Sequence, residues 1–553
     1  MTPHFAEYQP LPMAPSTPRT NNLGEIDSTH DFEARRQMLY GDGGTKRNLQ
    51  ERHLTMIALA GMIGTGLFLS SGKALAQAGP LGCVLGYLTM GTVTAAIAYC
   101  SAEMSAFKPI GGGFVRHATL WLDKSSGVST GWNFWYSMAV TMAAEISAAT
   151  TLIGFWAPNL NLCIPITIFW VVIIAVNLSP VRFYGEFEFY FAFIKICLIV
   201  GFILAGIILD LGGVPGQERL GFRYWKSPYP LFNEYISTGP GGRFLAFWST
   251  MISAAFAYGN VQVVAIAGAE TRDPRRSIPA ALKGTFFRVV FFYVVSIFVV
   301  SMVVPANDER LSLSTGTAAQ SPFVIAFSRA NIKALPSIIN AVILTSAFSS
   351  GNSCTFLASR TLHGLALDGN APKIFLRLNR FRIPYVAVGA SAIWGAITYM
   401  SVDKGAFQAF IWLVSLVTTA GIISWVIICL TYLRFFYALR KQDISRDRLP
   451  YKSPLQPYLT YYALIMNVLI LVFSGWTSFV GHFDVSMFLS NYLNCFIFPA
   501  MYLGCKLYFR DKSTPLEDID FQTELDAIEE EEIDRIYVVP KTTIYDSVLN
   551  RLF

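Results

Sequence analysis

The amino-acid sequence predicts an all-α polytopic membrane protein with twelve transmembrane helices, on two observations. Of its 553 residues, 53% are hydrophobic and 14% carry a charge, whereas soluble domains carry about 25% charged residues. Hydrophobic runs long enough to cross a bilayer, about 20 residues each, recur along most of the chain. Twelve is the most economical count of these runs, which lie at about residues 54–78, 80–107, 130–156, 163–180, 187–210, 244–269, 284–305, 335–360, 384–402, 407–434, 458–480 and 486–508.

The distribution of lysine and arginine predicts how these helices are oriented. Counted from an N-terminus inside the cell, the even-numbered loops carry most of the basic residues, among them Arg272, Arg275 and Arg276. The short odd-numbered loops at 157–163 and 481–485 contain none. Because positively charged loops stay on the cytoplasmic side, both termini are predicted to be cytoplasmic.

Composition divides the chain into four regions. Residues 1–50 are polar and lack the hydrophobic segment of a signal peptide, so we expect a disordered N-terminal tail. Residues 51–436 contain the first ten predicted helices, and residues 437–510 contain the last two. Residues 511–553 form an acidic C-terminal tail, which we expect to be solvated or to dock a partner.

The first hydrophobic run contains the sequence Gly61-Met62-Ile63-Gly64-Thr65-Gly66. Each glycine costs a helix about 1 kcal/mol relative to alanine, so this sequence favours a break in the helix. Within a membrane, an unwound turn persists only where it faces protein or a polar cavity. The free N–H groups where the helix resumes, from Leu67 on, could then receive a carboxylate. A small-residue face for close helix packing fits the same glycines equally well.

The sixth hydrophobic run contains a second candidate break, Ala257-Tyr258-Gly259-Asn260-Val261-Gln262. It places a glycine and two amides in the middle of the span, five helices after the first break. Interrupted helices at corresponding positions in two halves of a chain indicate a transport site. The two breaks together therefore favour a binding site over simple packing at residues 61–66.

Two ionisable side chains lie within the predicted spans. Glu145 is in the middle of the third run, where a carboxylate is costly unless it faces the interior of the bundle. It could contact a substrate amine or carry a proton, or it could be a structural lock bonded to its neighbours. Lys195 lies about two turns from the cytoplasmic end of the fifth run. It could extend to the lipid headgroups, or it could be a buried ammonium that gains and loses a proton.

The eighth run contains a cluster of short polar side chains at Ser346, Ser349, Ser350, Asn352 and Ser353. Such a cluster could bind an ion or receive the ammonium of a lysine, but it more often forms hydrogen bonds between helices. The eight cysteines and six histidines are scattered without the spacing of metal ligands, and no nucleophile–base pair lies near the spans. We therefore expect no metal, no cofactor and no enzymatic activity. We also expect no nucleic-acid partner, because the basic residues are spread over the inward-facing loops.

Four sequence motifs carry a resemblance to a known family. They are Arg52-His53-Leu54 followed by residues 61–68, Pro109-Ile110-Gly111-Gly112-Gly113-Phe114, Ala269-Glu270-Thr271-Arg272-Asp273-Pro274-Arg275-Arg276-Ser277-Ile278-Pro279, and Ser350-Gly351-Asn352-Ser353. Each is weak alone, but together they are specific. From about Arg52 to Arg510, the chain resembles the fungal amino-acid permeases of the amino acid–polyamine–organocation superfamily.

This resemblance implies a LeuT-type fold, with two inverted repeats of five helices, two further helices, and breaks in helices 1 and 6. It also implies proton-coupled import of an amino acid or related amine by alternating access at the plasma membrane, driven by a proton gradient. Its implied substrate-binding residues are Ile63, Gly64, Thr65, Gly66, Glu145, Phe256, Tyr258, Gly259 and Gln262. Lys195, Ser349 and Ser350 match the implied proton-coupling centre. By the same analogy, ubiquitin-ligase machinery acts on the cytoplasmic tails, with Lys46 as an acceptor.

One departure from the family pattern lies in the sixth run. Where many relatives read Gly-Thr-Glu, this chain reads Asn260-Val261-Gln262, so an amide replaces a carboxylate and an asparagine replaces the glycine of the break. We expect Gly259 to take over the unwinding by a shift of one residue. The lost charge leaves open a carrier of another amine, such as a polyamine or a carnitine-like compound. A sensor that binds an amino acid without transporting it, and signals through its tails, is a third interpretation.

Overall fold

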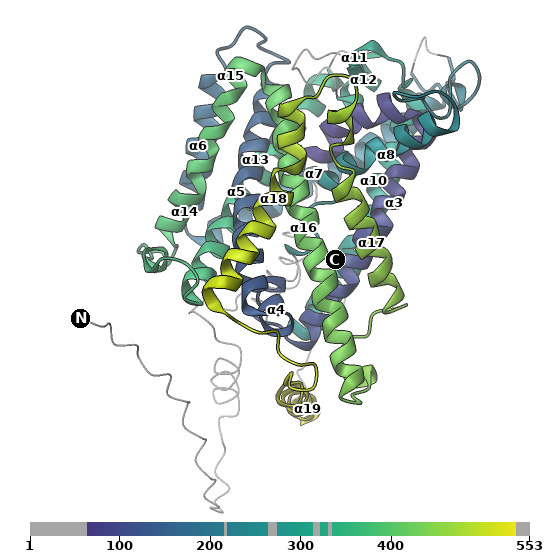
Figure 1. Ribbon diagram of the computed structural model, residues 1–553. Helices are drawn as coiled ribbons and strands as arrows, with labels where there is room; N and C mark the ends of the chain where they lie inside the picture. The colour runs from purple at the N-terminus through teal and green to yellow at the C-terminus, as the bar shows by residue number, and fades with distance from the viewer. Residues whose placement is uncertain (1–63, 215–217, 264–273, 313–320, 330–333, 538–553) are drawn as a thin grey trace, which may run out of the picture. The chain divides into compact units, whose positions relative to one another are not determined.

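The computed structural model describes residues 64–214, 218–263, 274–312, 321–329 and 334–537, which fold into helices without any strand (Figure 1). The α-helices of this described part are α3 (Ser71–Phe107), α4 (Phe114–Trp121), α5 (Lys124–Ile153), α6 (Cys163–Asn177), α7 (Val181–Asp210), α8 (Gly239–Ala257), α10 (Pro274–Val303), α11 (Glu309–Ser312), α12 (Pro322–Arg329), α13 (Leu335–Leu367), α14 (Tyr385–Ala392), α15 (Ser401–Lys404), α16 (Ala406–Lys441), α17 (Tyr458–Val472), α18 (Val485–Phe509) and α19 (Gln522–Tyr537). A π-helix, η1 (Gly66–Ser70), precedes α3, and the 3-10 helices are η2 (Arg223–Trp225), η4 (Lys373–Leu376), η5 (Ile393–Met400), η6 (Arg446–Arg448) and η7 (Trp476–Phe479).

Helices occupy the described part of each hydrophobic run from which a span was predicted, so the all-α class is confirmed. Among the described residues, four helical segments are long and apolar enough to cross a membrane by length and composition: Gly66–Phe107, Phe183–Asp210, Phe407–Lys441 and Tyr458–Phe479. Others, such as α5, are rich in small polar side chains because nearly their whole surface is buried in the bundle. The count of twelve crossings stays a prediction.

A break at Gly79 divides the first of these segments. Gly79 has φ 75° and ψ 175°, and Pro80 follows it within α3. Glycine adopts a positive φ at little cost, and a proline at the start of a helical stretch needs no hydrogen-bond partner for its nitrogen. Backbone hydrogen bonds to the loop at 231–233 occupy the groups freed by the break, from Asn233 N to Ala78 O (3.2 Å) and from Leu81 N to Leu231 O (3.1 Å). The break coincides with the boundary predicted between the first two runs.

The main helices pack in two groups. Helix α5 lies along α13 and α16, while α3 lies along α8 and α10 (Figure 1). The short helix η1 packs against α8, α3 and α12. The helix start at Gly66 therefore meets the end of α8, and these two segments are the described ends of the two predicted breaks.

The acidic C-terminal segment is not a free tail over its described part. Gln442 donates hydrogen bonds to the carbonyl groups of Leu516 and Ile519 (2.8 Å each), and Phe521 packs on Phe107 with ring centroids 5.7 Å apart. Helix α19 then buries Leu525, which lies four residues after Phe521. This spacing is that of a helical apolar stripe, so the segment docks on its own bundle rather than being solvated.

Candidate functional site

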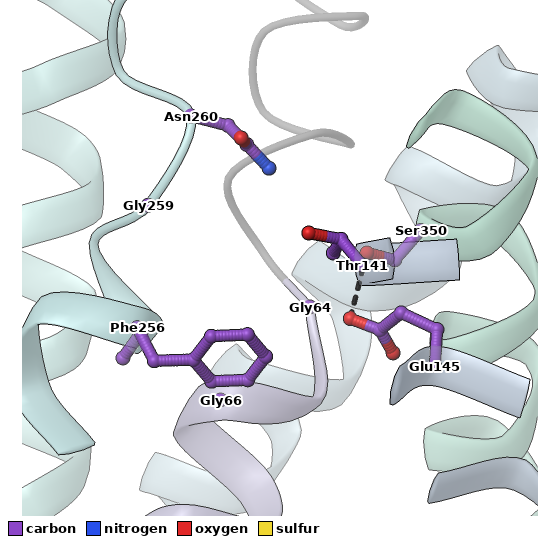
Figure 2. Close-up of a pocket in the computed structure, with 9 residues that line it drawn as sticks. Gly64, Gly66, Thr141, Glu145, Phe256, Gly259, Asn260 and Ser350 are labelled. Carbon is purple, nitrogen blue, oxygen red and sulfur yellow. Dashed lines mark hydrogen bonds between the residues drawn. The ribbon is translucent and has the colours of Figure 1, made fainter. Parts of the chain in front are cut away.

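A cavity lies where η1, α8, α5 and α13 meet. The space within it is about 270 Å³, including the part that is open to solvent. Its lining residues are Gly64, Gly66, Thr141, Glu145, Phe256, Ala257, Gly259, Asn260 and Ser350. Figure 2 shows Phe256 and Asn260 on one side of the cavity, Glu145, Thr141 and Ser350 on the other, and the backbone at Gly64 between them.

The start of the first described helix forms one wall. Thr65 has right-handed helical backbone angles, and the π-helix η1 begins at Gly66. A Cβ atom added to Gly64 would lie 3.1 Å from Glu145 Oε1 and 3.2 Å from Ser350 Oγ. A side chain at this position would therefore crowd the carboxylate, and the N–H groups in the first turn of a helix have no partner within that helix. Ile63, which was also predicted to bind substrate, lies outside the described residues.

Glu145 is held by hydroxyl groups from both neighbouring elements. Thr65 Oγ1 donates to Glu145 Oε2 (2.9 Å), and Ser350 Oγ donates to Glu145 Oε1 (2.9 Å). The glutamate is 2% exposed. The same side chain therefore lines the cavity and ties the first helix to α13. Its role toward a substrate or a proton stays a prediction.

Asn260 adopts the left-handed backbone conformation at the end of α8. Its φ is 67°, whereas Gly259 has no positive φ. Helix α8 ends at Ala257, so both Gly259, which was expected to take over the unwinding, and Asn260 lie in the non-helical turn, and Asn260 occupies the left-handed position. Asparagine visits this region more readily than other non-glycine residues because its short polar side chain bonds locally. Gly259 nonetheless lines the cavity, as predicted for the binding site.

Three predicted binding residues stand behind the cavity wall rather than on it. Thr65 is fully buried and supports Glu145. Tyr258 is 1% exposed and packs against Tyr293, with ring centroids 5.0 Å apart. The amide oxygen of Gln262 accepts a hydrogen bond from the indole of Trp425 on α16 (2.9 Å). These residues shape the site without lining it in this conformation.

A second buried polar cluster adjoins the site. Lys195 on α7 is 1% exposed, so its side chain does not reach the bundle surface as a snorkelling lysine would. It interacts electrostatically with Glu188 and with Glu145. Ser349 Oγ donates to Glu188 Oε2 (2.8 Å), and Asn352 Nδ2 donates to Glu188 Oε1 (3.1 Å).

Sequence reasoning missed Glu188 and Thr141. Glu188 precedes Lys195 by seven residues, which is two helical turns, and Thr141 precedes Glu145 by four, which is about one turn. Each spacing places the missed residue on the same helix face as a residue that was identified. This signal was present in the sequence, and a search of each helix face around the buried charges would have found both.

No group of three or more histidine, cysteine, aspartate or glutamate side chains lies together among the residues that the structure describes, so none of them forms a metal site there. The cavity offers backbone N–H groups, hydroxyl groups, amides, one aromatic ring and one carboxylate. Such a set is chemically suited to a small polar molecule.

Comparison with known proteins identifies the family. The family model described as amino acid permease matches residues 53–516. The chain belongs to the amino acid permease family. The resemblance drawn from the motifs is thus confirmed, and this permease is a multi-pass membrane protein and not an enzyme.

The relatives of this permease cover most of its length. It is 38% identical over 507 residues to the lysine-specific permease of Saccharomyces cerevisiae, covering 91% of this chain and 82% of the relative. It is also 38% identical over 493 residues to the proline-specific permease of Emericella nidulans, covering 88% and 89%. The basic amino-acid permease of Saccharomyces cerevisiae is 36% identical over 487 residues, covering 88% and 85%. These names span cationic and neutral amino acids.

Proposed function

We propose that this permease imports an amino acid together with protons, by alternating access around the cavity between η1, α8, α5 and α13. The observation that carries the proposal is the pairing, across one small cavity, of a helix start at Gly66 with the carboxylate of Glu145. An α-amino acid carries one negative and one positive group about two bonds apart. The site offers a complement to each.

The helix start supplies the positive side of this complement. N–H groups in the first turn of a helix have no partner within the helix, and the helix dipole adds about half a positive charge there. A substrate carboxylate at Gly64 and Gly66 would receive these N–H groups. Its ammonium would then face Glu145, whose two oxygens are already oriented by Thr65 and Ser350.

The lining of the cavity narrows the class of substrate. Glu145 alone is charged among the nine described residues that line it. No arginine or lysine stands there to receive a second carboxylate, so we propose a neutral or cationic amino acid and not a dicarboxylic one. Phe256 would cover the substrate from the side of α8 (Figure 2).

We further propose the LeuT-type arrangement of twelve crossings, with both termini cytoplasmic and the protein in the plasma membrane. The contact between the resumed first helix and the end of α8 supports this, because the breaks of helices 1 and 6 meet in that arrangement. The end of the bundle that carries α4 and α19 would face the cytoplasm. Lys195, with Ser349 and Ser350, would form the proton-coupling centre.

Residue Lys46 lies outside the described residues. We keep it as the proposed acceptor of ubiquitin, through which ligase machinery would control turnover. Replacement Lys46→Arg should lengthen the lifetime of the permease in the membrane, as measured by a chase after synthesis is stopped. An unchanged lifetime would count against this acceptor.

The experiment that tests the proposed function is uptake of labelled amino acids and polyamines in a transport-deficient host, with the external pH varied. Accumulation of one amino-acid class that rises as the external pH falls would support proton symport. Uptake of polyamines or carnitine-like amines alone would favour the alternative carrier. Binding without flux would favour a sensor.

A further inference from the structure

Helix α7 carries two buried side chains of opposite charge type, Glu188 and Lys195. Glu188 is fully buried and Lys195 is 1% exposed, and their spacing of seven positions places both on one face of the helix. Glu186, only two residues before Glu188, is exposed on the opposite face. Glu188 is therefore buried because it lies on the face of α7 that packs against the bundle, whereas the opposite face is exposed.

Neighbouring serines on α13 connect Glu188 to the substrate cavity. Ser350 donates to Glu145, and Ser349, the preceding residue, donates to Glu188. Asn352 also donates to Glu188, and its own amide oxygen accepts from Asn177 Nδ2 on α6 (2.7 Å). Two carboxylates are thus held by one short stretch of α13.

The ionisable groups of this cluster do not balance. Lys195 interacts with both Glu188 and Glu145, and the other titratable groups that face the cluster among the described residues are the thiol of Cys354 on α13, the phenol of Tyr184 on α7 and the phenol of Tyr293 on α10. When all three groups are ionised, one ammonium against two carboxylates leaves one negative charge in excess. Burying an unpaired charge is costly, so a second cation stabilises the cluster.

A substrate ammonium at Glu145 would supply that second cation. Lys195 would then pair with Glu188, and the loaded site would contain two neutral pairs. Without Glu188, the lysine ammonium and the substrate ammonium would compete for Glu145. With Glu188 present, protonation of Lys195 no longer opposes the binding of substrate at Glu145, and each event favours the other. Symport requires this positive coupling between proton and substrate binding.

We propose that Glu188 is a positioning residue for proton coupling, which draws the Lys195 ammonium away from Glu145 so that proton and substrate are bound together. This inference rests on the proposed function. In the proton-binding step, the lone pair of the Lys195 amine takes a proton from water on the outer side. In the release step, that N–H bond breaks and the proton passes to water on the inner side. Glu188 remains a carboxylate throughout.

The test measures substrate uptake at external pH values of about 5 and about 7 for the full-length protein and for Glu188→Gln. Glu186→Gln is the matched control on the same helix, and Glu188→Asp restores the charge. In the unaltered protein, the lower pH should raise the apparent affinity for substrate by about fivefold or more. Glu188→Gln should abolish this gain or reverse its sign, so that acid raises KM.

Counterflow of labelled substrate at equal pH on both sides separates coupling from folding. We expect Glu188→Gln to keep measurable counterflow, and we expect Glu188→Asp to recover acid stimulation. A variant that keeps the full affinity gain at low pH, with only a lower maximal rate, would show that Glu188 is merely structural. An unaltered protein that accumulates substrate without any response to pH would instead refute the proposed proton coupling itself.

Discussion

Gly66 lies directly against the backbone of Ala257, where the resumed first helix meets the end of α8. A Cβ added to Gly66 would lie 2.8 Å from Ala257 Cα and 2.9 Å from Phe256 Cδ1. Atoms of a backbone cannot move aside as the tip of a flexible side chain can. The two interrupted segments are thus fixed to each other at a position that tolerates only glycine.

Gly66→Ala should therefore separate the two walls of the cavity. Overpacking costs about 1–3 kcal/mol, so we expect uptake of the preferred substrate to fall by about tenfold or more. Gly201→Ala on α7 is the control, because nothing lies within 4 Å of its added Cβ. Uptake in Gly66→Ala equal to that in the control would show that this contact does not shape the site.

The carboxylate of Glu145 should be essential for uptake. Glu145→Gln keeps a hydrogen-bond acceptor for one hydroxyl but removes the charge that would face the substrate ammonium. Loss of a buried charge pair costs about 2–5 kcal/mol, so uptake should drop by at least roughly 30-fold. Ser350→Ala, which removes one donor to Glu145 and keeps its charge, should cause a smaller loss of about fivefold. Equal losses in the two variants would show that orientation and not charge is the role of Glu145.

The sequence predicts which residues belong to the site better than it predicts which residues contact one another there. The glycines at 61–66 and the buried Glu145 follow from helix propensity and from the cost of charge in lipid, which are local properties. The bond between Gln262 and Trp425 joins residues 163 positions apart, and no local pattern specifies such a partner. The same limit explains why Tyr258 and Gln262 were assigned to the lining although they lie behind it.

The C-terminal segment shows a different limit. Its negative charges dominate the composition of residues 529–532 and led to the expectation of a solvated or partner-docking tail. Its contacts depend instead on Phe521, Leu525 and Ile528, which are spaced along one helix face. A short amphipathic stripe outside the hydrophobic runs is easily hidden by the charges around it.

The Gln262–Trp425 hydrogen bond should position the segment that follows α8. Gln262→Ala and Trp425→Phe each remove this bond, and each should weaken the apparent affinity for substrate. Because both act on one interaction, the double variant should be no worse than the more affected single variant, with a coupling energy of about 0.5–3 kcal/mol. KM values of the four proteins measure this coupling, and strictly additive effects would contradict it.

Removing one acidic partner of Arg275 should loosen α19. Arg275 on α10 is 4% exposed, and its guanidinium donates to Glu524 (2.7 Å) and to Glu531 (3.1 Å) of α19 and to the carbonyl of Phe107 (2.5 Å). Hydrogen bonds between charged groups contribute about 1.5–3 kcal/mol. Glu524→Gln should therefore lower the melting temperature of the purified protein and expose α19 to protease.

Glu530→Gln is the matched control for this change, because Glu530 is also a glutamate of α19 but is exposed. We expect it to leave the melting temperature within about 1 °C of the original value. If Glu524→Gln behaved like Glu530→Gln in both the melting and the protease measurement, the docking of α19 would not depend on Arg275.

Asp308 lies in the connection between α10 and α11. Its contribution to the free energy of unfolding should be the same at about pH 5 and about pH 7, the two pH values of the uptake test. Burial opposes its ionisation, but hydrogen bonds from Arg310 and Arg329 prevail and lower the pKa of Asp308 from 3.8 to about 2. A carboxyl whose pKa is lowered by folding stabilises the fold fully at pH values above its pKa in the unfolded chain, and this contribution is lost as the pH falls through about 2.

Asp308→Asn should therefore lower the melting temperature by roughly 2 °C, equally at about pH 5 and about pH 7. It should leave the acid stimulation of uptake intact, unlike Glu188→Gln. A destabilisation that shrinks between about pH 7 and about pH 5 would show that Asp308 titrates within this range.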